Sequence, residues 1–274
     1  MSYSIQTNVN SIMAQENLRV NGDFQSRTIN RLTSGYRINS SGDDAAGLAV
    51  ANKFRSDIAE LQQGVRNAND GISTLQIIDG GLNNISKILD RLKTLATQSA
   101  SDTFTGDRDT INLEFTTLLG EIDRQAANIG LDTGGTYNAD IAVYIGGGGA
   151  TQANSQVSVD LSASESDSAG LGIDASTVDT SANALLAITA ISDAVTTLGL
   201  AQGAVGTGQN DLQYAVQLAQ SQISSFSAGE SRIRDADIAA EASNLTKAQT
   251  LTQASVAAMS QANSAPQALM QLLR

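Results

Sequence analysis

Apolar residues recur at alternating gaps of three and four positions over one long stretch, from Ile58 to Ala96. This spacing places them along a single narrow seam of an α-helix, as in a coiled coil. At 1.5 Å per residue the stretch forms a rod of roughly 58 Å, which is too long for a compact globule. We therefore predict that a second long helix packs against it. The seam residues are Ile58, Leu61, Val65, Ala68, Ile72, Leu75, Leu82, Ile85, Leu89, Leu92 and Ala96.

The same spacing returns between Leu185 and Ile233, which predicts the second rod. A shorter helix is expected between the two rods, with apolar residues from Ile111 to Ile129 and Gly130 as its stop signal. Only a turn at 102–109 separates it from the first rod, so we expect an antiparallel helical hairpin. The fold class is therefore mainly α, an antiparallel bundle of long helices.

Between these helices the apolar period changes to two. Residues 141–145 and 157–161 alternate apolar and polar side chains across a glycine run at 146–149, which predicts a small β-hairpin at about 137–162. The glycine run lacks a following Lys-Ser or Lys-Thr and opens no helix, so it does not fit a phosphate-binding loop. Residues 162–180 are rich in Ser, Ala, Asp and Gly and are expected to form a loop.

Two features of the first rod depart from a regular seam. Asp79 stands where the repeat calls for an apolar residue, and we expect it to face solvent or another subunit. Four glycines interrupt the helix, each at a cost of about 1 kcal/mol relative to alanine. We expect a neighbouring backbone to approach closely at these glycines, which are Gly64, Gly71, Gly80 and Gly81.

The apolar spacing at both ends of the chain predicts amphipathic helices that have no local partner. The first runs from about Val9 to Thr33, and the last follows a cap at Asp235 and is disrupted near its end by Pro266. These segments are either frayed termini or helices that order only on association.

Composition removes several classes of function. The chain has no His and no Cys, which excludes thiolate and imidazole catalysis and an ordinary zinc site. We expect no enzyme activity, no metal and no cofactor. Residues 1–124 carry a net charge of −3, residues 125–231 carry −10 with no Lys or Arg, and residues 232–274 carry +1. This acidic balance disfavours nucleic-acid binding. The N-terminus has no basic region, so we expect no cleaved signal peptide. The sequence has no run of 18 apolar residues, so we expect no membrane span.

Several motifs at the two ends resemble the terminal signatures of the bacterial flagellin family. The resemblance covers about residues 1–130 and 180–274. At the N-terminal end it rests on residues 31–40 (RLTSGYRINS), 43–49 (DDAAGLA) and 66–73 (RNANDGIS). At the C-terminal end it rests on residues 231–237 (SRIRDAD), 244–249 (NLTKAQ) and 261–267 (QANSAPQ).

The resemblance implies a structural subunit of the extracellular flagellar filament, which polymerises into a helical homo-oligomer for motility. It implies a coiled-coil inner-tube domain of residues 1–38 plus 236–274, and an outer-tube bundle of residues 39–235. Many relatives insert large variable domains where this chain has only the hairpin and loop, so we expect a minimal form. The alternative is the hook–filament junction protein, a hook-associated relative with similar ends. An enzyme or coiled-coil adaptor is a third class.

The resemblance also implies partners and contact residues. Subunits of this family leave the cell through the flagellar export apparatus, with a chaperone on the C-terminal helix, and meet filament cap and hook-associated proteins. The expected assembly residues are Val9, Ile12, Arg31, Leu32, Leu245, Leu251, Val256 and Met259.

A patch sensed by a Toll-like innate receptor in relatives maps onto Arg91, Leu95 and Glu114, although Asp90 departs from the more usual Gln. The alternative for these three residues is a solvated or inter-subunit face.

Overall fold

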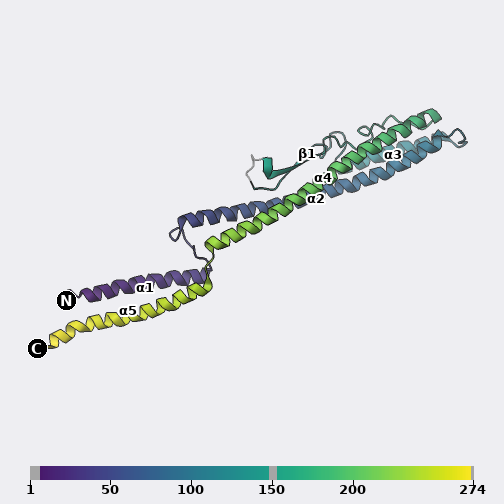
Figure 1. Ribbon diagram of the computed structural model, residues 1–274. Coiled ribbons are helices and arrows are strands. Elements are labelled where there is room, and N and C mark those ends of the chain that lie inside the picture. Colours follow the sequence, from purple (N-terminus) through teal and green to yellow (C-terminus); the bar gives the residue numbers. More distant parts are fainter. Residues whose placement is uncertain (1–6, 148–152, 273–274) are drawn as a thin grey trace. The chain divides into compact units, whose positions relative to one another are not determined.

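The computed structural model describes residues 7–147 and 153–272, with side chains up to Ser264. In this part of the chain it contains five α-helices and one two-stranded antiparallel sheet (Figure 1). The predicted fold class is confirmed. The chain divides into two compact units, residues 57–224 and residues 1–56 together with 225–274.

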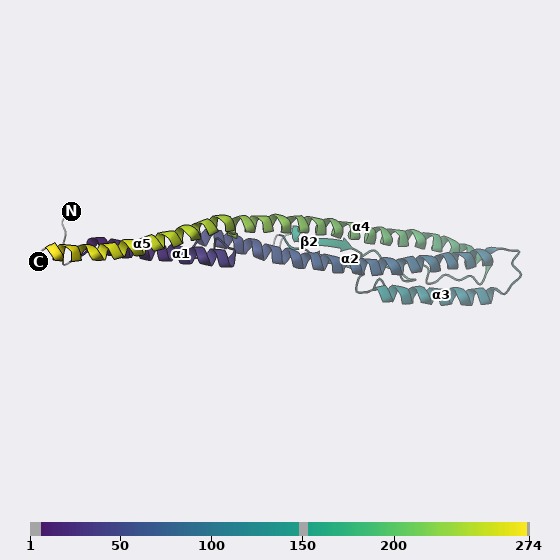
Figure 2. The ribbon, with the colours of Figure 1, turned by 90° about the horizontal axis from the view of Figure 1, so that it is seen from below.

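The unit of residues 57–224 is built on two long helices, α2 (Ala45–Ala100) and α4 (Ser181–Arg234), which run antiparallel. The Ser181 hydroxyl donates to the Ala100 carbonyl over 2.9 Å at one end. Further along, a methyl group at Gly71 would lie 3.2 Å from Leu212. Helix α3 (Arg108–Ile129) returns antiparallel along α2, as Figure 2 shows. The two predicted rods and the helical hairpin are therefore confirmed.

The buried seam of α2 follows the expected spacing, with one change of register. Ile78, which the sequence analysis left out, is fully buried and takes the place of Asp79 in the repeat. Asp79 itself is only half-buried and accepts a hydrogen bond from the Asn83 side chain at 3.4 Å. In α3, Leu119 is buried and belongs to the face that packs inward. The seam residues of α2 that lose nearly all solvent contact are Leu61, Ala68, Leu75, Ile78, Leu82, Ile85, Leu89, Leu92 and Ala96.

The glycines of α2 have different surroundings. A Cβ at Gly64 would lie 1.7 Å from the Ile145 carbonyl oxygen, so the expected close backbone is confirmed there. At Gly71 and Gly81 the nearest atoms belong to side chains, those of Val143 and Ile129. At Gly80 nothing lies within 4 Å, so that expectation was wrong.

The β-hairpin lies over α2 and α4. Strands β1 (Asp140–Tyr144) and β2 (Gln156–Asp160) pair antiparallel, with Val143 opposite Val157. The predicted hairpin is confirmed, and a short 3₁₀ turn η1 (Ala153–Ser155) precedes β2. The glycine run expected to join the strands extends into 148–152, which lie outside the described residues.

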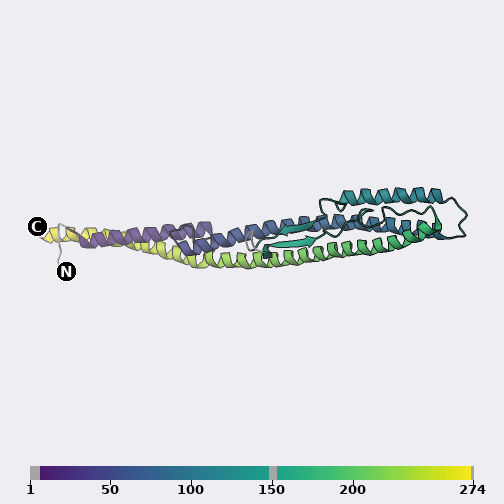
Figure 3. The ribbon, with the colours of Figure 1, turned by 90° about the horizontal axis from the view of Figure 1, so that it is seen from above.

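Three of the contacts that attach the hairpin to α2 lie at the end of β1. The Tyr144 hydroxyl donates to the Glu60 carboxylate at 2.7 Å, and the Asn67 amide donates to the Tyr144 carbonyl at 3.0 Å. The third is the backbone approach at Gly64. Glu60, Gly64 and Asn67 lie on one face of the helix because they are spaced by four and three residues. This face of α2 therefore receives the end of β1 (Figure 3).

The expected loop at 162–180 has no regular secondary structure, yet it is well packed. Ile173 and Val178 are fully buried, and Asp167 is 9% exposed. Burial tends to raise the pKa of Asp167, but hydrogen bonds from Gly170 and Thr133 outweigh it and lower the pKa below its ordinary value. The Asp167 carboxylate therefore ties this loop to Thr133, just after α3, by hydrogen bonds.

Helix α4 is long and apolar enough to cross a membrane, with a mean hydropathy of 1.7 over its most apolar window and 33% of that window buried. The sequence analysis expected no such segment. The buried residues recur at gaps of three and four from Ala184 to Leu212, and Ala219 follows two turns later. Leu212 faces α2 and Gly208 faces β2, while Leu185, Leu186 and Leu200 of the same helix stay 58%, 71% and 72% exposed.

Candidate assembly surface

The terminal helices α1 (Val9–Ser34) and α5 (Ile238–Leu272) pack against each other in antiparallel orientation. The bounds predicted for α1 are correct to within one residue. Asn8 caps its start, and Gly35 ends it in the left-handed conformation with φ 74°. Two predictions for α5 were wrong: Asp237, not Asp235, accepts from its first N–H groups, and the helix continues through Pro266 to Leu272.

The seam between α1 and α5 is unusually polar for a coiled coil. Its buried and half-buried positions recur at gaps of three and four on both helices, yet half of the fourteen carry polar side chains. Asn21 donates to the Ser255 hydroxyl at 2.9 Å across the seam. The positions are Ser11, Ala14, Leu18, Asn21, Gln25, Thr28 and Leu32 on α1, and Glu241, Leu245, Ala248, Thr252, Ser255, Met259 and Ala262 on α5.

Apolar side chains lie on the outside of this pair instead. Val9, Ile12 and Met13 are 58%, 57% and 60% exposed on the side of α1 opposite the seam. A soluble helical pair normally buries its large apolar residues and exposes its polar ones. This pair follows that rule only in part, because it leaves large apolar residues exposed and encloses polar ones. The exposed apolar residues, here named the outer rows, are Val9, Ile12, Met13, Val20 and Ile29 on α1 and Ile238, Leu251 and Val256 on α5.

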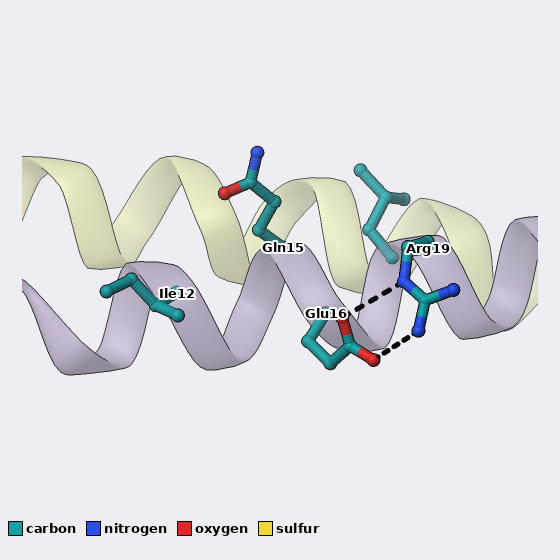
Figure 4. A pocket seen from close by; sticks show the side chains of 5 residues that line it. Ile12, Gln15, Glu16 and Arg19 are labelled. Carbon is teal, nitrogen blue, oxygen red and sulfur yellow. Dashed lines mark hydrogen bonds and ion pairs between the residues drawn. The ribbon is translucent and has the colours of Figure 1, made fainter.

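Four charged side chains on α1, those of Glu16, Arg19, Asp23 and Arg31, form ion pairs within the unit. Glu16 and Arg19 form an ion pair of 2.6 Å one turn apart, beside a surface hollow of about 430 Å³ that Ile12 also lines (Figure 4). The hydrogen bond from Arg19 lowers the pKa of Glu16 below its ordinary value. Arg31 reaches Glu241 of α5 at 3.3 Å. The outer surface of α1 therefore combines apolar residues with self-neutralised charges.

The segment that follows α1 (residues 35–37) is hydrogen-bonded to the segment between α4 and α5 (residues 234–236). The Arg37 N–H donates to the Arg234 carbonyl at 2.6 Å, and the Ala236 N–H donates to the Gly35 carbonyl at 2.9 Å. The Arg234 guanidinium lies over the Tyr36 ring, 4.1 Å from its centre. Sequence reasoning missed this joint, because nothing in the local pattern links residue 36 to residue 234.

The predicted assembly residues divide between the seam and the outer rows. Leu32, Leu245 and Met259 are half-buried in the seam, where α1 faces α5. Arg31 bridges the two helices through its ion pair with Glu241. Val9, Ile12, Leu251 and Val256 belong to the outer rows. These eight residues stay a prediction for assembly, and the structure separates those that lie between the two helices from those left open.

The three residues of the predicted receptor patch do not form one surface. Arg91 of α2 and Glu114 of α3 are about half exposed and form an ion pair of 2.5 Å. Leu95 is 2% exposed and cannot offer its side chain to a partner in this fold. That part of the expectation is corrected, because α3 packs on this part of α2.

Comparison with known families and proteins adds evidence along the whole chain. The model of the bacterial flagellin N-terminal helical region matches residues 5–130, and that of the C-terminal helical region matches residues 188–273. A flagellin of Halalkalibacterium halodurans is 34% identical over 98% of this chain and 99% of its own length. The chain belongs to the bacterial flagellin family.

Other relatives and one solved structure are of the same kind. The flagellin of Listeria monocytogenes is 35% identical over 98% of this chain and 99% of its own length. The flagellar filament 33 kDa core protein of Treponema phagedenis is 33% identical over the same shares. A crystal structure of Bacillus cereus flagellin is 26% identical, covers 56% of this chain and 88% of that one, and has a TM-score of 0.47. The Halalkalibacterium, Listeria and Treponema proteins match this chain nearly end to end, so they have a similar length.

Proposed function

We propose that this chain polymerises through its terminal helices as the structural subunit of a flagellar filament. The observation that carries the proposal is the set of apolar outer rows that the α1–α5 pair leaves exposed while half of its seam positions are polar. Filament proteins among the relatives named above support the same role.

The physical argument concerns what covers the outer rows. Eight apolar side chains on two adjacent helices are between 38% and 60% exposed. Each Å² of apolar surface that leaves water contributes about 25 cal/mol, so covering these rows stabilises an assembly substantially. A second copy of the chain offers the same rows, and a head-to-tail contact that does not close extends into a helical polymer.

In this proposal residues 1–38 plus 236–274 form the inner tube of the filament, and residues 39–235 form the outer layer. The crossing of Arg37 and Arg234 lies at the border between them and supports the division. Export without a cleaved signal, a chaperone on α5, and cap and hook-associated partners complete the proposal. Contact with a Toll-like innate receptor is proposed only for Arg91 and Glu114, which are exposed.

Seeded polymerisation tests this function. Purified protein added to short filament fragments is expected to extend them into long filaments visible by electron microscopy. The physical reason is that each added copy covers outer rows that the previous copy left open. Failure to extend the seeds at any protein concentration contradicts the filament role.

The junction role makes a different prediction in the same experiment. A hook–filament junction protein adds a few copies at one location and stops, so the seeds would gain no measurable length. The relatives reported above carry flagellin or filament core names, which favours the filament role.

A further inference from the structure

The single proline of the chain lies inside a helix. Pro266 belongs to α5, which runs on to Leu272. Proline has no backbone N–H, so it cannot donate the helical hydrogen bond to the carbonyl four residues earlier. The carbonyl that loses this donor is that of Ala262, which faces α1 at the end of the seam.

A side chain of the other helix supplies the missing donor. The Asn8 side-chain amide donates to the Ala262 carbonyl oxygen at 2.8 Å. The same side chain accepts from the Ser11 N–H at 3.1 Å and so caps the start of α1. One turn further, the Ser11 hydroxyl donates to the Asn263 side chain at 2.7 Å. Asn8 therefore satisfies an open donor of α1 and an open acceptor of α5 at once.

We propose that Asn8 and Pro266 together fix the register of α1 against α5. Because the chain has one proline, Ala262 is the one α5 carbonyl deprived of its donor in this way. If α1 shifted by a turn, Asn8 would meet a carbonyl that already accepts a helical hydrogen bond, and the Ala262 carbonyl would be left without a donor.

The seam needs such a device because its apolar content is low. In most coiled coils large apolar residues fill specific holes and a few polar residues select the register. Here Asn21 with Ser255 and Arg31 with Glu241 are polar contacts of the same antiparallel register. The inference rests on the proposed function, because an unsatisfied carbonyl is costly only when neighbouring copies exclude water from it.

A double-mutant cycle in seeded polymerisation of the full chain tests the inference. Asn8→Ser keeps a capping oxygen for α1 but is too short to reach α5. Pro266→Ala returns a helical donor to the Ala262 carbonyl. We expect Asn8→Ser alone to raise the critical concentration roughly tenfold, as the loss of a buried hydrogen bond does. In the Pro266→Ala background we expect the same substitution to have less than about a threefold effect.

Asn10→Ser is the matched control, because Asn10 is exposed on the same first turn of α1. It is expected to leave the critical concentration unchanged. Equal effects of Asn8→Ser and Asn10→Ser, or an Asn8→Ser effect of the same size in both backgrounds, would overturn the inference. Amide exchange within the filaments gives a second readout: Asn8→Ser should speed exchange in the first turns of α1, and unchanged exchange there also contradicts the inference. Wild-type protein that fails to extend seeds would instead defeat the proposed function.

Discussion

Replacing Gly64 by alanine is expected to destabilise residues 57–224 by about 3 kcal/mol, the upper part of the range for overpacked cores. The added methyl group would lie 1.7 Å from the Ile145 carbonyl oxygen, and that atom belongs to the backbone. Relief requires the end of β1 to leave α2, which also strains the hydrogen bonds from Tyr144 to Glu60 and from Asn67 to Tyr144. Urea unfolding followed by circular dichroism measures the change.

Gly80→Ala is the matched control on the same helix. Nothing lies within 4 Å of a Cβ at that position, so alanine is expected to stabilise α2 by about 1 kcal/mol. Two variants with the same covalent change should therefore shift stability in opposite directions. Equal effects of the two substitutions would show that the hairpin does not rest on α2 at Gly64.

Deleting residues 236–274 is expected to abolish polymerisation while residues 57–224 stay folded. The deletion removes α5, and with it the seam partner of α1 and the outer-row residues Ile238, Leu251 and Val256. The other unit keeps its own buried core on α2, α3 and α4. Seeded polymerisation and thermal unfolding, measured on the same preparation, separate the two effects.

A point substitution removes less of the chain and tests the same surface. Ile12→Asp places a charge in the outer row of α1 but leaves the seam intact, because Ile12 is 57% exposed on the opposite side. It is expected to raise the critical concentration at least tenfold, since burying an unpaired charge between copies is costly. A chain that carries Ile12→Asp, or that lacks residues 236–274, and still forms filaments like the unchanged chain would contradict the role of the terminal helices.

The long helices could be predicted from the sequence because their packing is periodic. Alternating gaps of three and four residues appear directly in the order of apolar side chains. Local rules also place helix ends: Gly130 ends α3, and the Asp44 side chain caps the start of α2. The register at residue 79 could not be resolved in this way. Ile77, Ile78 and Asp79 are adjacent, and only the partner surfaces decide that Ile78 turns inward while Ile77 stays 68% exposed.

The candidate site was less accessible to sequence reasoning. Apolar residues such as Val9 and Ile12 stand out in the pattern, but the residues that pair α1 with α5 are mostly small or polar and carry no hydrophobic signal. The partner of Asn8 lies 254 positions away, at a carbonyl that Pro266 leaves without its helical donor. Contacts such as that between Tyr36 and Arg234 depend on how distant segments cross, which local propensity does not encode.

Thiol labelling at position 12 tests whether the outer rows are buried between copies. The chain has no cysteine, so Ile12→Cys introduces a single reactive thiol. In a separate variant, Ala175→Cys places a control thiol at an exposed position of the loop at 162–180. We expect the thiol at position 12 to react readily in the free subunit and at least a hundredfold more slowly in filaments, while the control thiol reacts alike in both states. Equal labelling at position 12 before and after polymerisation would contradict assembly through the outer rows.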